Sequence, residues 1–228
     1  MKIYFAGISG NKKRLDYLKD FGATRLMLTY ADVKSYNCQM PRFKEKKFDI
    51  LFDSGAFSLF NRGIKIDIYD YCEYLKINKL EKYIVLDKIG NHSETMQNQK
   101  IMEDYGMKPI PVFHMGSPLE NLHEIIEKDY EYICLGGSVG ASRNKRIDFF
   151  EVVFCNFPNH KFHGLGLSDF KIMKMFPFHS VDSTTWLIAE KVGKIFNDFG
   201  VRVTPPETMV AKDRFQNTIG FFVRIEEL

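Results

Sequence analysis

The feature that most constrains the fold of this chain is a unit that recurs along most of its length. A short apolar run is followed by a glycine or polar break, and then by a segment of helical period. Several of the runs are apolar without alternation, which is typical of strands buried on both faces of a sheet. The eight runs are KIYFAGIS (2–9), RLMLTYA (25–31), DILFDSGAF (49–57), KYIVLDKIG (82–90), KPIPVFHMG (108–116), YICLGGSVG (132–140), KFHGLGLS (161–168) and HSVDSTTW (179–186).

The segments between the runs carry apolar residues at helical spacing, which predicts helices packed on a sheet. Asp67 and Ser93 are expected to cap two of these helices. The methionine-rich segment 170–178 is also expected to form a helix with a hydrophobic face. The stripes consist of Ile68, Tyr71, Cys72 and Leu75, of Leu119, Leu122 and Ile126, and of Ile188, Val192, Ile195, Phe196 and Phe199.

Eight strands that alternate with helices predict parallel βα units. A doubly wound open sheet competes with this interpretation, but eight units that close on themselves favour a compact (β/α)8 TIM-type barrel. We therefore expect an α/β fold with a single domain over residues 1–228, in which 201–228 is a C-terminal extension. Two segments fit less well, because 36–48 lacks a clean helical pattern and Pro205-Pro206 predicts a break rather than a core element.

Composition excludes several classes of protein. The net charge is only +3, so any basic face must be local. The four cysteines are scattered without a CxxC pair or a neighbouring histidine cluster, which argues against a zinc site or a disulfide framework and favours reduced, mostly buried thiols. The N-terminus lacks the apolar stretch of a signal peptide, and no run reaches the length of a membrane span. We expect a soluble cytoplasmic protein with no membrane partner.

Polar residues stand where the predicted strands end. In a barrel of this kind the loops that follow the strands share one mouth, so residues at these ends are expected to converge. A single aspartate after a strand can simply cap the next helix, but three carboxylates, a histidine and two glycine-rich turns favour a site. The residues are Asp53, Asp87, His114, Gly136, Gly137, Gly164, Gly166 and Asp182.

Carboxylates gathered in a partly apolar mouth can hold different protonation states, because burial and mutual repulsion separate their pKa values. One can then attack a sugar carbon while another transfers the proton, as in retaining glycosyl transfer. The turns LGGSVG and HGLGLS offer bare backbone groups against which a flat purine can lie, although glycine also serves simply to turn a strand into its helix.

DSGAF, LGGSVG, HGLGLS and SVDS, in this order at these strand ends, resemble the tRNA-guanine transglycosylase superfamily. The resemblance is greatest to its small, phage-type members, the 7-deazaguanine DNA transglycosylases, and it runs from about Asp49 to Trp186. It implies a base-exchange pentosyltransferase that replaces guanine in DNA with a 7-deazaguanine such as preQ0, without a cofactor. A phage-encoded protein of this kind works in the host cytoplasm.

The resemblance also implies roles for individual residues. Asp182 corresponds to the nucleophile that attacks C1′, and Asp53 corresponds to the carboxylate that moves the proton. Asp87 matches a position that binds the purine edge, whereas His114 lies where the tRNA enzymes usually carry glutamine. The further residues assigned to substrate binding are Ser54, Gly55, Gly136, Gly137, Gly164 and Gly166.

Two departures from the tRNA enzymes point to DNA as the substrate. The chain has no cluster of three cysteines and a histidine for their structural zinc, and Asp182 is followed directly by a predicted helix. It also lacks an appended RNA-binding domain. A target base must be flipped or single-stranded to reach a barrel mouth, so phosphate contacts are expected around it. The candidates are Arg42, Lys44, Lys46, Lys47, Arg62, Lys65, Arg143, Lys145 and Arg146.

Other readings stay open from the sequence. An ordinary solvated surface explains any single one of these basic residues. Phe57 and Phe60 are expected in the core rather than on a base, and His163 and His179 are expected to be structural or surface residues. The alternatives for function are a transglycosylase acting on tRNA with queuine or a preQ base, a nucleic-acid-binding homologue without catalysis, and a small-molecule glycosidase. The oligomeric state and target sequence are left open.

Overall fold

The computed structural model describes residues 1–8, 12–32, 40–56 and 65–226. Strands and helices alternate through most of the chain, as the recurring unit predicts. The strands are β1 (Lys2–Phe5), β2 (Arg25–Thr29), β3 (Asp49–Asp53), β4 (Val112–His114), β5 (Tyr132–Gly136), β6 (Lys161–Gly164), β7 (Ser180–Ser183), β8 (Ile195–Phe196) and β9 (Arg202–Val203). The α-helices are α1 (Lys12–Asp20), α3 (Met40–Glu45), α5 (Ile68–Ile77), α6 (His92–Asp104), α7 (Leu119–Glu127), α8 (Arg143–Asn156), α9 (Phe170–Met175), α10 (Ile188–Val192) and α11 (Ala211–Glu226).

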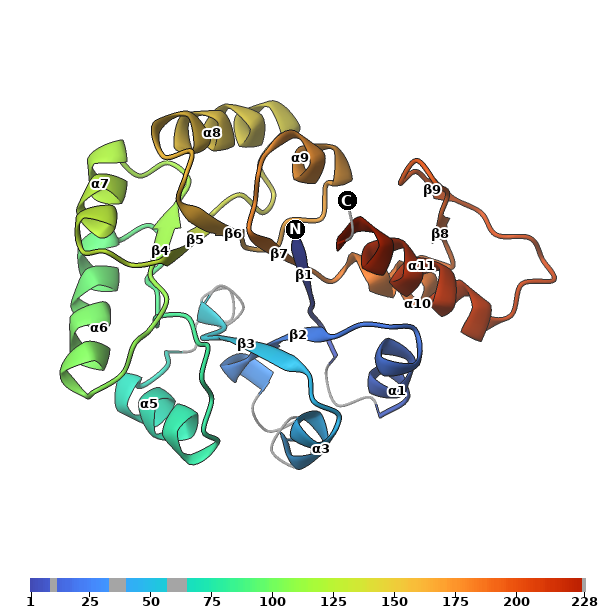
Figure 1. The fold of residues 1–228 in the computed structure, drawn as a ribbon, viewed down its shortest axis with the longest axis horizontal. Coiled ribbons are helices and arrows are strands. Elements are labelled where there is room, and N and C mark those ends of the chain that lie inside the picture. The colour runs from blue at the N-terminus through green and yellow to red at the C-terminus, as the bar shows by residue number, and fades with distance from the viewer. Residues whose placement is uncertain (9–11, 33–39, 57–64, 227–228) are drawn as a thin grey trace.

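Within the described residues, β1 to β7 form one seven-stranded sheet in the order β3-β2-β1-β7-β6-β5-β4. All pairs in this sheet are parallel. The sheet is curled and helices surround its outer face (Figure 1). Seven of the eight predicted runs therefore contain a strand. The eighth, 82–90, contributes two isolated parallel bridges, Tyr83 with Phe52 of β3 and Ile84 with Ile110, just before β4.

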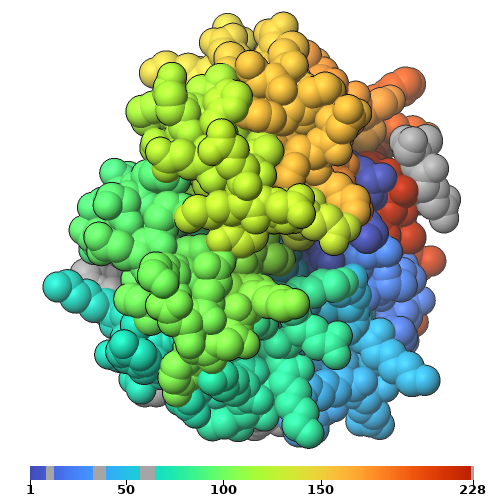
Figure 2. Space-filling model, turned by 60° about the vertical axis from the view of Figure 1, so that its left-hand side comes forward, coloured from blue at the N-terminus to red at the C-terminus, as the bar shows by residue number. Residues whose placement is uncertain are grey.

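Apolar side chains fill the inside of the curl and the layer between the sheet and the helices. Fully buried aromatic residues come from several strands, among them Phe5, Phe52, Phe113 and Phe162. Each contributes roughly 1.5–3 kcal/mol by leaving water. Figure 2 shows the outer wall from the side of α6 and α7, in green, with the yellow and orange segments of α8 and α9 above them.

The predicted helical stripe over 188–199 is wrong in its second half. Helix α10 ends at Val192, and Gly193 follows in a left-handed conformation with φ of +64°. A left-handed residue is a common helix terminator, and glycine adopts it without steric cost. The chain then forms the antiparallel hairpin β8–β9, in which Ile195 pairs with Val203.

The C-terminal extension belongs to the core, contrary to the expectation from Pro205-Pro206. The proline pair does interrupt regular structure, but α11 begins five residues after it. This helix buries Phe215, Ile219 and Phe222, among others, and packs against β1, α1 and α10. Its end reaches the start of the sheet, where Glu226 accepts a hydrogen bond from the backbone N–H of Ile3.

Of the two predicted helix caps, one is confirmed and one is wrong. The side chain of Asp67 caps α5 as expected, by accepting hydrogen bonds from the N–H groups of Tyr69 and Asp70. At α6, however, the cap is Asn91 rather than Ser93, because Asn91 has the extended backbone that a capping residue needs and Ser93 lies inside the helix. Part of the segment 36–48, which lacked a clean pattern, forms the short helix α3.

Candidate active site

Strand register brings the predicted carboxylates to one edge of the sheet. Asp53 is the last residue of β3, and Asp182 is the third residue of the four-residue strand β7. His114 ends β4, and Asp87 follows the bridge segment 83–84 that lies between β4 and β3. Because all of these strands are parallel, the four side chains share the carboxyl end of the sheet. Within this edge they form two hydrogen-bonded groups.

The first group is centred on Asp87. One carboxylate oxygen of Asp87 lies 2.9 Å from Nε2 of His114, and the other accepts a hydrogen bond from the hydroxyl of Ser54 at 3.2 Å. All three side chains are buried. The sequence predicted that these residues meet. It did not predict that His114 contacts Asp87 directly, so the two side chains act as a coupled pair.

The second group is centred on Asp182. Its Oδ1 accepts a hydrogen bond from the backbone N–H of Gly166 at 2.7 Å and lies 3.3 Å from Nε2 of His163. The other ring nitrogen of His163 contacts the hydroxyls of Ser180 and Tyr132. His163 is fully buried, so of its two predicted interpretations the structural one holds and the surface one does not. The side chain extends the site beneath Asp182, in a polar chain that ends at Tyr132.

Among the described residues, Asp53 has fewer hydrogen-bond partners than Asp87 or Asp182. It is half-buried, and its Oδ2 accepts a hydrogen bond from the backbone N–H of Gly55 at 2.9 Å. Burial, together with the nearby carboxylates of Asp87 and Asp182, raises the pKa of Asp53 to about 7. A carboxyl group with such a pKa can carry a proton at neutral pH and can also give it up.

Cys134 gives independent evidence that the three carboxylates converge. This thiol is fully buried in β5, on the far side of the sheet order from β3. Burial raises its pKa well above the usual range, and Asp53, Asp182 and Asp87 all add to the rise through their negative charge. Three aspartates from distant parts of the chain therefore lie near this one buried thiol.

The glycines at the strand ends make room for neighbouring protein atoms. Gly55 has φ of +75°, and an added Cβ would stand 2.4 Å from the hydroxyl oxygen of Thr29. An added Cβ on Gly136 would meet the ring of His114 at 3.0 Å, and one on Gly137 would meet backbone atoms of Met115. The structural need for glycine at these positions is thus local packing.

The glycines of the following turn have the same kind of neighbours. A Cβ on Gly164 would contact Leu167 and Phe178 at 3.1 Å, and one on Gly166 would meet Val139 at 2.7 Å. The turn after β6 is therefore pressed against the turn after β5. This contact fixes the N–H of Gly166 where it reaches Asp182.

The predicted basic residues divide between the two ends of the sheet. Arg42 and Lys44 lie in helix α3 rather than in a loop, and Lys46 and Lys47 directly precede β3, at its amino end. Arg42 and Lys46 pair with Asp16, and Lys44 donates to the carbonyl of Asn78. This group is therefore remote from the mouth, because the chain runs from it into the amino end of the strand.

The remaining basic residues follow the carboxyl ends of strands. Lys65 is exposed just before α5, and Arg143, Lys145 and Arg146 open α8 after β5. Arg143 and Arg146 both pair with Asp169, at 2.7 and 3.3 Å, and so connect the loop after β5 to the loop after β6. Arg62, Phe57 and Phe60 lie outside the residues that the structure describes.

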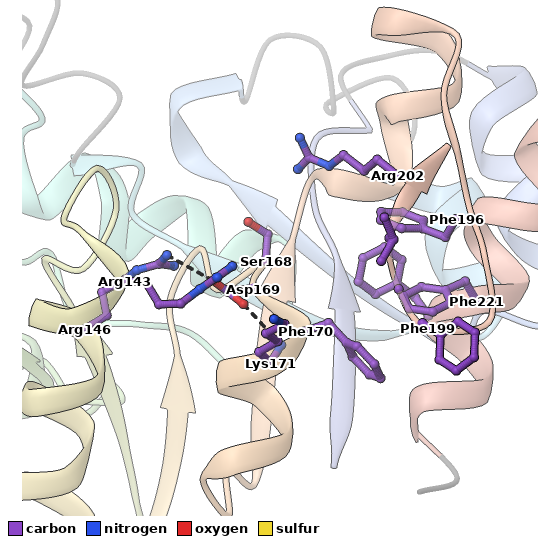
Figure 3. A pocket seen from close by; sticks show the side chains of 13 residues that line it. Arg143, Arg146, Ser168, Asp169, Phe170, Lys171, Phe196, Phe199, Arg202 and Phe221 are labelled. Atoms are coloured by element: carbon purple, nitrogen blue, oxygen red, sulfur yellow. Dashed lines mark hydrogen bonds and ion pairs between the residues drawn. The ribbon is translucent and has the colours of Figure 1, made fainter. Parts of the chain in front are cut away.

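A cavity of about 380 Å³ lies beside the carboxylate site, where the loop after β6 faces the β8–β9 hairpin and α11. Sequence reasoning missed it, because it assigned the hairpin residues to a helix. Figure 3 shows the charged residues of α8 and α9 near one side of the cavity and the phenylalanines of the hairpin and α11 on the other. Its lining is Arg143, Arg146, Ser168, Asp169, Phe170, Lys171, Phe196, Phe199, Gly200, Val201, Arg202, Phe221 and Phe222.

Three further observations bear on the chemistry of the described residues. No group of three or more His, Cys, Asp or Glu side chains among them is arranged to hold a metal ion. No described helix is long and apolar enough to cross a lipid bilayer. Of the cysteines in these ranges, Cys72 and Cys134 are free and buried, whereas Cys155 is free and exposed.

The curled parallel sheet, its ring of helices and a polar site at the strand ends define an α/β protein of the TIM-barrel class. Comparison with known proteins supports this class at the level of the fold. No family model matches the chain, and no curated protein matches it. The chain is similar to several solved structures at 9–11% sequence identity.

Three of these structures illustrate the similarity. A chain of the tryptophan synthase complex from Pyrococcus furiosus is 11% identical, with a TM-score of 0.62 over 98% of this chain and 97% of that one. A structure from Aquifex aeolicus VF5 is 11% identical, with a TM-score of 0.61 over 98% and 92%. The tryptophan synthase alpha chain from Legionella pneumophila is 9% identical, with a TM-score of 0.58 over 100% and 93%. Such identities establish a shared fold alone.

Proposed function

We propose that this protein exchanges a guanine base in DNA for a 7-deazaguanine, through a covalent bond between an aspartate and the sugar. The observation that carries the proposal is the convergence of Asp53, Asp87 and Asp182 at one edge of the sheet, with a pKa of about 7 at Asp53. The sequence resemblance of DSGAF and SVDS to transglycosylases supplies the reaction. The geometry supplies groups that can carry it out.

The reaction needs one nucleophile and one proton carrier. The Asp182 carboxylate attacks C1′ of the target nucleotide as the bond between C1′ and the guanine nitrogen breaks. Protonated Asp53 gives its proton to the departing guanine. The incoming 7-deazaguanine then loses its proton to the Asp53 carboxylate and attacks C1′, which releases Asp182 and restores both groups. No external oxidant or cofactor enters this balance.

The partners of each aspartate suit these roles. Asp182 is held by the Gly166 amide and by His163, which orient one of its oxygens and leave Oδ2 for attack. Asp53 has the raised pKa that a proton carrier needs near neutral pH. Asp87 and His114 form a buried acceptor–donor pair, a type of group that recognises the edge of a purine.

Exchange also requires the base to leave its stack. We infer that segment 83–84 takes the eighth position in a closed barrel, since it bridges β3 on one side and the chain before β4 on the other. A closed barrel gives the carboxylates a single mouth, which a stacked base inside a duplex does not reach. The target nucleotide is therefore flipped out or single-stranded.

The decisive test is mass spectrometry of nucleosides from DNA and tRNA after incubation with labelled guanine or preQ0. We expect incorporation into DNA, loss of incorporation in Asp182→Ala, and full incorporation in the control Asp148→Ala, which changes an exposed carboxylate on α8. Exchange that persists in Asp182→Ala would defeat the mechanism. Incorporation into tRNA alone would change the substrate, and tight binding of nucleic acid without any exchange would indicate a non-catalytic protein.

A further inference from the structure

The cavity beside the carboxylate site presents an aromatic ring to solvent on a well-ordered turn. Phe199 is 82% exposed. The turn that carries Phe199 is held by hydrogen bonds. The side-chain oxygen of Asn197 accepts hydrogen bonds from the N–H groups of Phe199 and Val201 at 3.1 and 2.9 Å. The backbone of Asn197 closes the same turn, by bonding to Val201 and Gly200. The turn therefore holds a large apolar ring in a fixed position at the rim of the cavity, where a ligand can stack on it.

The same turn also packs closely against α9 and α11. Gly200 has φ of +72°, and an added Cβ would lie 2.7 Å from the ring of Phe170 and 3.0 Å from that of Phe221. The ring of Phe221 stacks on that of Phe196 in β8, with centroids 4.7 Å apart. The hairpin is thereby held against α9 and α11, and the cavity between them has a rigid aromatic wall.

The charged residues of the cavity are mostly basic. Its lining includes four cationic side chains, those of Arg143, Arg146, Lys171 and Arg202, and a single carboxylate, that of Asp169. Asp169 pairs with the two arginines of α8, and Nε of Arg146 is buried without a hydrogen-bond partner. The excess of positive charge favours an anionic ligand, and the aromatic wall favours one that carries a flat ring.

The cavity is also close to the proposed nucleophile. Gly166 donates its N–H to Asp182, and Ser168, only two residues further along, lines the cavity. Two residues of extended chain span at most about 7 Å. A strand whose target sugar lies over Asp182 therefore passes within reach of the cavity.

We propose that this cavity binds a nucleotide of the strand that carries the exchanged base, with its ring on Phe199 and its phosphate among Arg143, Lys171 and Arg202. The inference rests on the proposed function for the identity of the strand. A phosphate bound to a flat ring could also come from a free mononucleotide, so the test includes one. The cavity holds a neighbour of the target nucleotide, and the exchanged base itself occupies the carboxylate site.

The test measures binding of a short fluorescent single-stranded oligodeoxynucleotide that contains guanine. We expect Phe199→Ala to weaken binding roughly 5- to 150-fold, because base stacking on an aromatic ring contributes that much per base. Arg202→Ala is expected to weaken binding and to reduce the slope of log affinity against log salt by about 0.7, the value for one lost phosphate contact on a single strand. Both side chains are exposed, so both variants are expected to fold, which thermal melting checks.

Two control variants separate this site from general surface effects. Ile77→Ala removes an apolar side chain that is 76% exposed at the end of α5, and Lys128→Ala removes an exposed cation after α7. Both are expected to bind the oligonucleotide as the unaltered protein does. Equal binding by all four variants would overturn the proposal, and so would displacement of the oligonucleotide by dGMP at the same concentration as by an unlabelled strand.

The two proposals fail in different ways. If the unaltered protein exchanges no base but Phe199→Ala and Arg202→Ala lose oligonucleotide binding, the exchange reaction is refuted and the cavity stands as a nucleic-acid site. If base exchange occurs and neither variant changes binding of the strand, the cavity proposal is refuted and the reaction stands.

Discussion

The raised pKa of Asp53 makes the stability of the protein depend on pH in a defined direction. The carboxyl has a pKa of about 7 in the folded protein and 3.8 as the reference for the unfolded chain. Between these values the unfolded state releases a proton that the folded state retains. Asp53 therefore does not lower the free energy of unfolding at low pH, but it lowers it increasingly as the pH rises from about 4 to about 7.

The size of this cost follows from the separation of the two pKa values. Each pKa unit corresponds to about 1.4 kcal/mol, so the full cost is about 4 kcal/mol above neutral pH, and somewhat less than half of it is present near pH 5. Asp53→Asn replaces the carboxyl with a neutral group of the same shape, which can still accept the N–H of Gly55. The difference in free energy of unfolding between Asp53→Asn and the unaltered protein is expected to increase by about 2 to 3 kcal/mol from about pH 5 to about pH 8, in favour of the variant.

Urea denaturation of both proteins at several pH values measures this difference directly. Asp148→Asn, at an exposed position on α8, controls for the loss of one carboxylate. The reasoning is refuted if the stability difference between Asp53→Asn and the unaltered protein is constant with pH or decreases as the pH rises. The same variant is expected to lose base exchange, so the stabilising change and the loss of activity would coincide in one side chain.

Two further substitutions test the supports of the site. His163→Ala removes a buried hydrogen-bond partner of Asp182, and we expect kcat for base exchange to fall about 10- to 100-fold with little change in KM; an unchanged kcat would show that the Gly166 amide alone positions Asp182. Gly55→Ala places a Cβ at 2.4 Å from Thr29 and is expected to destabilise the fold by more than about 2 kcal/mol. Gly90→Ala is the matched control, because Gly90 has φ of +73° but no neighbour within 4 Å, so the two variants should differ in urea midpoint.

The repeating unit was enough to predict the parallel sheet and the edge at which the polar residues meet. This works because the period of apolar residues and the breaks after them are local properties of the chain. Asp53, Asp87, His114 and Asp182 could be grouped without knowing the register, since parallel strands place all of their carboxyl ends together. The actual pairing of His114 with Asp87 required the lateral order of the strands.

The residues that sequence reasoning missed depend on long-range contacts. His163 reaches Asp182 only because β6 pairs with β7 in a register that sets His163 opposite Ser180. The cavity arises because Gly193 ends α10, and because α11 then returns to pack against β1. Neither feature has a signal within a short window of sequence. Protein side chains and backbone approach the glycines of the strand ends closely, and their contact with a base stays a prediction.

The hydrogen-bond partners of the three aspartates are consistent with the proposed division of roles between Asp53 and Asp182. Three negative charges around one point repel each other, and each must be neutralised, paired or held by donors. The hydrogen-bond partners of Asp87 are Ser54 and His114, and those of Asp182 are the backbone N–H of Gly166 and the ring of His163. Asp53 accepts a hydrogen bond from the backbone N–H of Gly55, no side chain among the described residues donates to it, and its pKa rises to about 7. The raised pKa makes Asp53 the group suited to carry a proton, and the donors that hold one oxygen of Asp182 are consistent with its proposed role as the nucleophile.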